Sequence, residues 1–389
     1  MRTPVRSRLF SPAFVALAIA ELAYFLAAGM AIPLTPLFAE GPLGSDAVGT
    51  GLAIGAFSVT ALVLRPVAGP AADRWGRRPL LIGGALLCAA AFAAHTVASS
   101  LGVLIGLRLV LGIAEAFFFV AAFAALADLA PPGRAGEALS FNSLSLYLGI
   151  AVGPLLGEWL LNAGGFGLAW WGTAALAAAA ALLSLMLPET GERSSAAAPS
   201  IVLFHPAAVG PGLALFAGIA AMSGFLGFVA IHARDVGMDG SGSALLLFGL
   251  AVVGCRVVFA SLPDRVPPFR LGTAALAVTA IGMGVVGVVV SVPGLLVGAV
   301  VMGVGVAFIT PALFAAILVR VSPGERGAAM GTMSLFIDLA FGAGPIMVGT
   351  LAGASSLPVG FLAAALVAAI GALASATFLL RRPDTAPAG

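Results

Sequence analysis

Long apolar segments follow one another along the 389-residue chain, separated by short clusters of Gly, Pro and charged residues. A helix needs about 20 predominantly apolar residues to cross the hydrocarbon core of a bilayer. Cutting the chain at the polar clusters predicts about twelve such helices. Their expected spans are 11–38, 47–68, 80–99, 101–127, 138–161, 168–187, 207–231, 243–262, 271–291, 295–320, 328–351 and 358–380. The pattern predicts an all-α polytopic membrane protein.

Composition supports a membrane location. Hydrophobic residues make up 61% of the chain and charged residues 9%, with a mean hydropathy of +1.14. A soluble domain has about a quarter charged residues, so this chain lacks the polar residues to cover itself in water. The lipid bilayer is therefore the expected partner. The net charge of +2 and the lack of a basic tail give no reason to expect nucleic-acid binding.

Arginine placement predicts the orientation, because cytoplasmic loops carry the excess of basic residues. The first apolar run continues past residue 30, too long for a cleaved signal, so we expect it to stay as a helix. With the N-terminus inside, only Arg234 falls on the opposite side. The expected cytoplasmic arginines are Arg2, Arg6, Arg8, Arg74, Arg77, Arg78, Arg134, Arg193, Arg265, Arg270, Arg320, Arg326, Arg381 and Arg382. We expect a multi-pass protein of the inner (plasma) membrane with both termini in the cytoplasm.

An internal repeat divides the chain. Arg65 and Arg256 are 191 positions apart, and so are Asp73 and Asp264. The same offset relates Pro132-Gly133 to Pro323-Gly324 and Gly153-Pro154 to Gly344-Pro345. A constant offset predicts two six-helix halves of parallel topology. We expect an N-terminal half over 1–187, a cytoplasmic linker over 188–206 and a C-terminal half over 207–389.

The charged cluster after the second apolar segment reads Gly69-x3-Asp73-Arg74-x-Gly76-Arg77-Arg78, and we place it on a short cytoplasmic loop. Gly69 would let the end of helix 2 approach a neighbouring helix, and Gly76 would permit a tight turn. Asp73 can accept hydrogen bonds from the N-terminus of a nearby helix. The arginines face the anionic leaflet or pair with nearby acids, the alternative being that each is a simple topology anchor.

Helices 4 and 5 contain two further motifs. Helix 4 carries Arg108-x3-Gly112 and Glu115 on one face. Arg108 should face protein or a water-filled cavity, unless it snorkels to the interface. Helix 5 carries Gly149-x3-Gly153-Pro154-x2-Gly157, where small residues four apart allow backbone contact and Pro154 bends the helix. The alternative for helix 5 is ordinary small-residue packing.

Acidic residues at membrane depth are the candidates for proton coupling. Glu21, Glu115 and Asp338 fall well inside apolar runs, and Glu158 lies near an outer end. Intramembrane carboxylates mark ion pathways because burial makes the charged form costly and protonation reversible. The alternative is a fixed ion pair, for instance with Arg108. We expect Arg65 and Arg256 to be snorkelling or interhelical anchors rather than substrate ligands.

The sequence offers no sign of an enzyme. It has neither a nucleophile elbow nor a phosphate-binding Gly-loop, and no His, Cys or carboxylate cluster has metal-ligand spacing. Cys88 and Cys255 fall within apolar segments and are expected to be small buried residues rather than a disulfide or metal pair. We expect no cofactor and no metal.

Taken together, these motifs resemble those of the major facilitator superfamily over essentially the whole chain. The resemblance implies a twelve-helix fold with helices 1, 4, 7 and 10 around a central cavity. It also implies that Asp73 docks near Met330 at the start of helix 11 in the outward-facing state, and that Arg77 pairs with Asp128. The helix 5 motif resembles that of drug/proton antiporters, although Glu158 stands where a second Gly is usual.

We therefore expect a secondary transporter that exports a small amphipathic or hydrophobic compound, such as a drug or natural product, in exchange for protons. The expected cavity helices are rich in Phe, Met and Ala, whereas a sugar site would need more hydrogen-bonding side chains. The alternatives are a proton symporter or uniporter for a small metabolite, such as a sugar or organic acid, and a non-transporting sensor or enzyme. The expected functional unit is a monomer.

Overall fold

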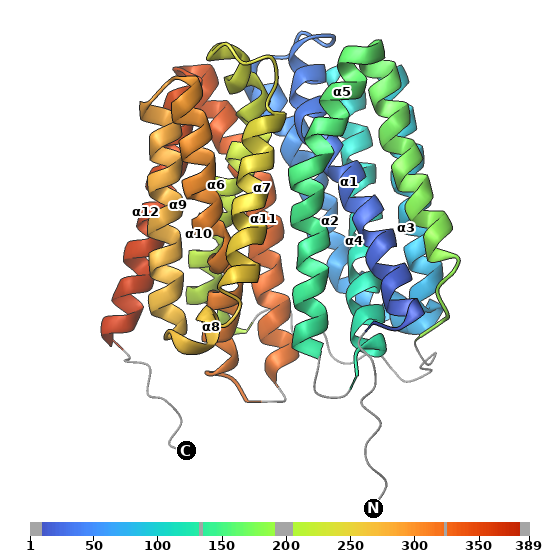
Figure 1. Ribbon diagram of the computed structural model, residues 1–389, viewed down its shortest axis with the longest axis vertical. Coiled ribbons are helices and arrows are strands. Elements are labelled where there is room, and N and C mark those ends of the chain that lie inside the picture. The colour runs from blue at the N-terminus through green and yellow to red at the C-terminus, as the bar shows by residue number, and fades with distance from the viewer. Residues whose placement is uncertain (1–9, 132–134, 191–204, 323–324, 382–389) are drawn as a thin grey trace, which may run out of the picture.

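The structure is a computed structural model that describes residues 10–131, 135–190, 205–322 and 325–381, and these residues form helices and turns with no strand (Figure 1). The helices are α1 (Pro12–Glu40), α2 (Ala47–Trp75), α3 (Arg77–Ala94), η1 (His95–Val97), α4 (Leu101–Leu129), α5 (Ala135–Ser184), α6 (Pro206–Asp235), α7 (Gly242–Val258), α8 (Leu262–Arg265), α9 (Pro268–Val288), α10 (Val292–Leu318), α11 (Arg326–Ala354) and α12 (Leu357–Arg381).

Ten of the described helices are long and apolar enough to cross a membrane, and α7 is a shorter apolar helix. The longest, α5, has non-helical backbone angles at Gly164 and Gly165, with a φ of +72° at Gly165. Its two parts run in opposite directions on either side of this break (Figure 1). The predicted spans 138–161 and 168–187 lie on the two sides of the break.

Local sequence signals explain where several helices begin. Side-chain oxygens of Ser11, Asp46, Ser100 and Ser291 each accept a hydrogen bond from a backbone amide in the first turn of α1, α2, α4 and α10. These amides have no intrahelical partner, so a short polar side chain before the apolar run satisfies one of them. Four of the polar breaks in the hydropathy pattern are therefore also helix caps.

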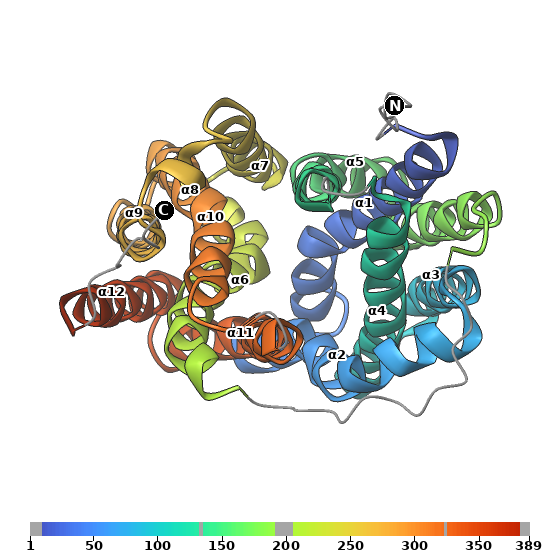
Figure 2. The same cartoon turned by 90° about the horizontal axis from the view of Figure 1, so that it is seen from below.

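Buried side chains gather into two cores. One core is built from residues of α1 to α5, and the other is built mainly from residues of α6 to α12. We call these helix sets the N-terminal and C-terminal bundles, and Figure 2 shows them side by side. The main contacts between them join α2 to α11, α5 to α7 and α1 to α6. Ile54, Tyr147 and Ile150 of the N-terminal bundle join the core of the C-terminal bundle.

The predicted loop between the second and third helices is wrong. Residues 69–75 belong to α2, α3 begins at Arg77, and only Gly76 separates the two helices. Hydropathy marks where the apolar segment ends, but polar residues can continue a helix beyond that point. Gly76 has φ +99°, which agrees with the expected tight turn. Gly69, expected to make a close helix contact, has no atom near the position of a Cβ.

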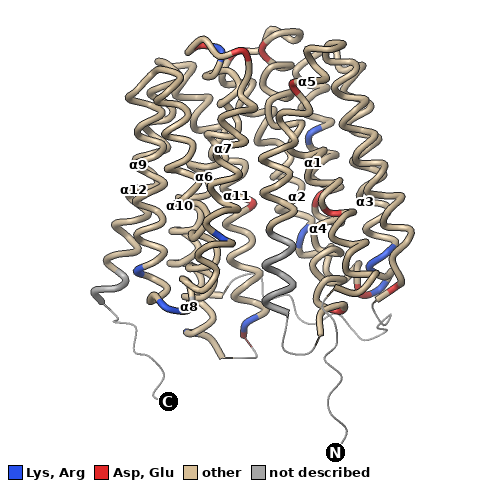
Figure 3. Tube along the Cα trace, in the orientation of Figure 1, with Lys and Arg blue, Asp and Glu red and all other residues tan. Residues whose placement is uncertain are grey.

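Charge separates the two ends of the molecule. We call the end where α1 begins and α12 ends the lower end, as in Figure 1, and the opposite end the upper end. Figure 3 shows basic residues mostly at the lower end and within the helices. The described lower-end arginines are Arg74, Arg77, Arg78, Arg265, Arg270, Arg320 and Arg326. The upper end carries Glu40, Asp46, Glu158, Asp235, Asp239 and Arg234.

Candidate functional site

An ion pair joins the two bundles in the interior of the molecule. Arg65 of α2 donates through Nη2 to Asp338 Oδ1 of α11 at 2.6 Å, and its Nε lies 2.6 Å from Oδ2. The side chains of Arg65 and Asp338 are 13% and 4% exposed. Because Arg65 contacts both carboxylate oxygens of Asp338, the pair fixes the relative orientation of the two side chains in addition to the charge attraction between them. The α2–α11 interface therefore has a buried Arg–Asp pair that connects the bundles.

Glu115 of α4 is the third member of this cluster. Its Oε1 lies 3.9 Å from Arg65 Nη2, and its side chain is 27% exposed, more than either of the other two. Two carboxylates around one guanidinium carry a net negative charge when both are ionised. The cluster is therefore electrically balanced when it holds one proton, and Glu115 is the member most open to exchange.

Aromatic rings surround the charged cluster. The Arg65 guanidinium lies 4.9 Å from the centre of the Phe119 ring, and Phe119 contacts Phe25 of α1. Tyr24 of α1 stacks on Phe118 with ring centres 3.9 Å apart. These contacts join α1, α2 and α4 with apolar rings next to charge. Tyr24, Phe25 and Phe118 are buried in the core beside the cluster, whereas Phe119 is partly buried.

The other two predicted coupling residues lie in different surroundings. Glu21 of α1 is buried, at 1% exposure. Arg108 donates from Nε to Ala53 O and from Nη2 to Ile54 O of α2, at 3.2 and 3.1 Å. It therefore stabilises the packing of α4 on α2 and does not form the ion pair with Glu115 that the sequence left open. Its guanidinium also lies 5.0 Å from the Phe57 ring centre.

The sequence analysis expected Arg65 to be a snorkelling or interhelical anchor, and did not connect it with Asp338 and Glu115. Its partner Asp338 lies 273 positions away, on a helix of the other bundle. No local pattern marks such a pair. The one signal in the sequence is the 191-residue offset between Arg65 and Arg256, which places both arginines at equivalent positions of the repeat.

Arg256 of α7 occupies a comparable place in the α5–α7 interface. Its guanidinium lies 4.7 Å from the ring centre of Tyr147 of α5, and its Nε donates to Ala307 O at 3.2 Å. Tyr147 and Asp338 are also 191 positions apart. The same offset thus relates both arginines and both of their partners across the interfaces, although the partners differ in charge.

The charged motif at the lower end forms a small network. Arg77 Nε lies 3.2 Å from Asp128 Oδ2, the pair that the resemblance implies, and Arg77 Nη2 lies 2.9 Å from Asp73 Oδ1. Glu189 accepts a hydrogen bond from the Arg77 amide at 2.8 Å, and Arg74 is exposed. These contacts join α2, α3 and α4 with the segment that follows α5.

The expected docking of Asp73 at the start of α11 is absent from the contacts of the described residues. The Asp73 side chain is 54% exposed and pairs with Arg77 instead. At the start of α11, Gly327 and Gly331 have no atom near the position of a Cβ. The open space at these two positions of α11 agrees with the lack of a docking contact among the described residues.

The glycine motif of α5 packs directly on α1. A Cβ at Gly153 would lie 2.8 Å from Gly29 Cα, and one at Gly157 would lie 2.9 Å from Met30 O. A Cβ at Gly149 would collide with the carbonyl of Phe25. Pro154 lies inside the helix next to this contact. The backbone contact expected from the small residues is present, and any role in exchange transport remains a prediction.

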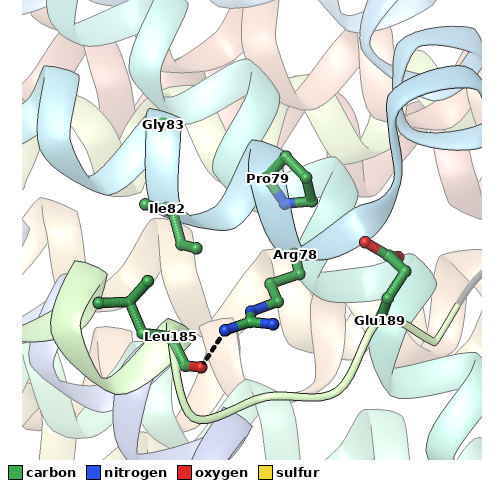
Figure 4. Close-up of a pocket in the computed structure, with 6 residues that line it drawn as sticks. All are labelled: Arg78, Pro79, Ile82, Gly83, Leu185 and Glu189. Atoms are coloured by element: carbon green, nitrogen blue, oxygen red, sulfur yellow. Dashed lines mark hydrogen bonds between the residues drawn. The ribbon is translucent and has the colours of Figure 1, made fainter.

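One surface groove lies away from the charged cluster. It has a volume of about 520 Å³ and lies at the lower end of the N-terminal bundle, between Arg78, Pro79, Ile82, Gly83, Leu185 and Glu189. Figure 4 shows Arg78 pointing toward the carbonyl of Leu185, to which its Nη2 donates at 2.5 Å. Because this arginine is bound to the protein's own backbone, we assign the groove no part in transport.

Neither cysteine pairs with another, and Cys88 is buried while Cys255 is partly buried. Among the described residues, no group of three or more His, Cys, Asp or Glu side chains could hold a metal ion.

Comparison with known proteins gives one consistent result. A sequence profile described as Major Facilitator Superfamily matches residues 17–292 and 270–389. An uncharacterized MFS-type transporter of Salmonella typhimurium is 30% identical over 344 residues, covering 83% of this chain and 85% of the relative. One from Burkholderia mallei is 32% identical over 337 residues, covering 83% and 81%.

Solved structures share the fold at lower sequence identity. A bacterial homologue of the human lysosomal transporter Spinster aligns over 100% of both chains with a TM-score of 0.79 and 16% identity. The human organic anion transporter MFSD10 aligns over 93% of this chain and 98% of its own, with a TM-score of 0.71 and 21% identity. A mutant of the nucleoside transporter NupG aligns over 94% of this chain and 99% of its own, with a TM-score of 0.76 and 16% identity.

Proposed function

The chain belongs to the Major Facilitator Superfamily, and from that premise we propose that it exports a small amphipathic or hydrophobic compound, such as a drug or natural product, in exchange for protons. As a member of this family it is a membrane transporter of small molecules and not an enzyme. Direction, coupling ion and cargo are the parts that the proposal adds.

The observation that carries the proposal is the cluster of Arg65, Asp338 and Glu115 between the bundles. Arg65 belongs to one bundle and Asp338 to the other, so any movement that separates the bundles here must change this ion pair. When Arg65 moves, the charge balance of Glu115 changes with it. A proton taken up by Glu115 offsets the loss of its guanidinium neighbour, which couples protonation to the movement. Glu21, buried on α1, is the second candidate carrier.

The cargo follows from the rings near the cluster. The partly buried ring of Phe119 lies next to Arg65, and the buried rings of Tyr24, Phe25 and Phe118 pack behind it, so the polar cluster has apolar surroundings. A sugar would need a set of amide and hydroxyl side chains facing it, and these rings do not supply one. The fit is better for an apolar molecule with one polar or charged group.

We propose a twelve-helix architecture in which α5 crosses the membrane twice and α7 once, with two six-helix halves over 1–187 and 207–389. The offset of 191 residues between the pairs Arg65–Asp338 and Arg256–Tyr147 supports this division. The segment 188–206 is then the linker, mostly outside the described residues. The arginine-rich lower end faces the cytoplasm of a bacterial inner membrane. The transporter works as a monomer.

We assign the structure to a state that is closed at the upper end. Cβ atoms at Gly51 and Gly55 of α2 would lie 2.6 Å from backbone carbonyls of α11 near the upper end. At the lower end, no described atom lies within 4 Å of a Cβ placed at Gly327 or Gly331 of α11, and Asp73 pairs with Arg77 instead of α11. The motif of α2 and α3 then acts as the lower-end latch, and its docking belongs to the opposite, outward-facing state.

The test is transport by proteoliposomes with an imposed pH gradient and a panel of amphipathic compounds. The expected result is cargo movement opposite to proton movement. Glu115→Gln should abolish gradient-driven transport while leaving cargo binding measurable and independent of pH. Glu40→Gln, which changes an exposed carboxylate at the upper end, is the matched control and should transport normally.

Other outcomes select the alternatives. Proton and cargo moving in the same direction would make the protein a symporter. Transport without a response to the gradient, in both wild type and Glu115→Gln, would make it a uniporter. No transport of any compound would favour a sensor.

A further inference from the structure

One carboxylate joins the bundles at the upper end of the α5–α7 interface. Oε1 of Glu158 accepts hydrogen bonds from the amide and the hydroxyl of Ser241, both at 2.7 Å, and Oε2 accepts from the Gly242 amide at 2.8 Å. We propose that Glu158 is an upper-end latch that holds this state closed and must release α7 each time the transporter opens on that side. The proposal rests on the proposed function, because a latch requires bundles that move.

The chemistry of the contact makes it strong. The first amides of a helix lack intrahelical partners, and the helix dipole places partial positive charge there, so a carboxylate is stabilised at that position. Hydrogen bonds to an ionised group are stronger than those between neutral groups. Ser241 makes no side-chain hydrogen bond to cap its own helix and donates its hydroxyl to Glu158 instead. The start of α7 is therefore capped by the other bundle.

The surrounding residues are small enough to admit the carboxylate. A Cβ at Gly240 would lie 2.6 Å from Glu158 Oε2, and one at Gly242 would lie 3.0 Å from the same atom. On the other side, Gly157 lies against Met30 of α1, so the backbone that carries Glu158 is held by the contact between α1 and α5. The residue that departs from the usual glycine of the antiporter motif is thus the one that reaches across the interface.

The corresponding place in the α2–α11 interface has no such latch. Gly349 lies 191 positions after Glu158, and Thr50 and Gly51 lie 191 positions before Ser241 and Gly242. A Cβ at Gly349 would collide with the carbonyl of Ala47, so backbone packing takes the place of a carboxylate there. The Thr50 hydroxyl is buried without a hydrogen-bond partner. The carboxylate contact is a feature of one interface and not a general property of both.

The experiment measures distances between spin labels in the full-length protein, in a Cys88→Ala/Cys255→Ala background whose transport has been verified. One pair, at Asn162 and Asp235, reports on the upper end, and another, at Trp75 and Gly327, reports on the lower end. All four positions are exposed. Glu158→Gln puts an amide group where one acceptor oxygen was and removes the charge. The ratio of upper-closed to upper-open molecules should fall about tenfold or more, with a matching shift at the lower end.

Two further variants keep the test independent of folding. Ser241→Ala removes only the hydroxyl bond and should shift the same ratio in the same direction by less. Glu40→Gln, a carboxylate at the upper end of α1, should leave it unchanged. Unchanged distances in both Glu158→Gln and Ser241→Ala, in a protein whose wild type transports, would overturn the latch and leave the proposed function intact. If the wild type never transports and never changes its distances, the proposed function fails and the latch with it.

Discussion

Two of the interfaces between the bundles use the same arginine position of the repeat for different chemistry. In the α2–α11 interface, Arg65 meets the carboxylate of Asp338 and has Glu115 nearby. In the α5–α7 interface, Arg256 meets the ring of Tyr147, which carries no charge. Protonation of a carboxylate would weaken the contact of Arg65 with Asp338, whereas the contact of Arg256 with the Tyr147 ring involves no carboxylate. In the proposed mechanism, proton coupling belongs to the α2–α11 interface, and Glu158 is the latch of the α5–α7 interface.

The largest effect should come from removing the buried charge of the first interface. Asp338→Ala leaves Arg65, only 13% exposed, with Glu115 as its one acidic neighbour at 3.9 Å. Breaking one side of a buried ion pair costs about 3–5 kcal/mol of stability. We expect a large drop in the unfolding midpoint in detergent and loss of transport. A midpoint equal to that of the wild type would show that the pair does not hold the bundles.

Glycines of the same interface should come next. Gly55→Ala would place a Cβ 2.6 Å from the Gly342 carbonyl, and such overpacking costs about 1–3 kcal/mol. Gly254→Ala in α7 is the control, since nothing lies near the position of its Cβ and alanine favours the helix. In thermal unfolding, Gly55→Ala should lower the unfolding midpoint and Gly254→Ala should raise it. Equal unfolding midpoints for the two variants would mean that α2 and α11 can move apart to admit the added methyl group without loss of stability.

In the second interface, Arg256→Met should be milder. It removes a cation–π contact worth about 0.5–2 kcal/mol and one hydrogen bond to Ala307 O. We expect reduced but measurable transport that keeps the pH dependence of the wild type. Initial rates in proteoliposomes over a range of pH would check this. A changed pH dependence would move part of the coupling to the α5–α7 interface and contradict the comparison.

Asp73→Asn should separate stability from transport. The Asp73 side chain is 54% exposed, and an exposed ion pair such as that with Arg77 contributes about 0–1 kcal/mol. The unfolding midpoint should hardly change, while transport should fall strongly because, in the proposed mechanism, Asp73 docks on α11 in the opposite state. Asp264→Asn, in the second copy of the motif, should reduce transport less. Equal losses at both positions would make the motif a folding anchor.

The smallest effect concerns Glu325, at the lower end before α11. Hydrogen bonds from the hydroxyl and amide of Ser322 lower the pKa of Glu325 below its usual value near 4.5. Because the folded-state pKa is lowered, its contribution to stability is present above the unfolded-state value and is lost as the pH falls through the lowered pKa. Carboxyl titration by NMR should find this shift in the wild type and lose it in Ser322→Ala. A normal pKa in the wild type would refute it.

Hydropathy predicted most helices closely because the apolar core of a bilayer sets their length. The first span was predicted at 11–38 and observed at Pro12–Glu40. The end of α2 was missed because Asp73 and Arg74 continue the helix beyond the apolar segment. Caps such as Asp46 and the break at Gly164–Gly165 follow local rules and were within reach of the sequence.

The candidate site was predicted only in part. Glu115 and Asp338 stood out because each is a charged residue inside an apolar segment. Such a residue can be recognised from the sequence of its own helix. Their relation through Arg65 depends on how the bundles face each other, and no local pattern contains that information. The same limit applies to Glu158 and the start of α7, which come together from positions 83 and 84 residues apart. Pairing across an interface is a property of the assembled bundles.

The single residue between α2 and α3 restricts how the length of the chain can vary. With only Gly76 between two helices, an inserted residue has no loop to enter and must lengthen one helix. Each added helical residue turns the downstream part of the chain by about 100° and advances it by about 1.5 Å. Arg77 would then face away from Asp128. Insertions and deletions should therefore be rejected here even where substitutions are tolerated. The number of residues between Asp73 and Arg77 is fixed by the packing of α2 and α3.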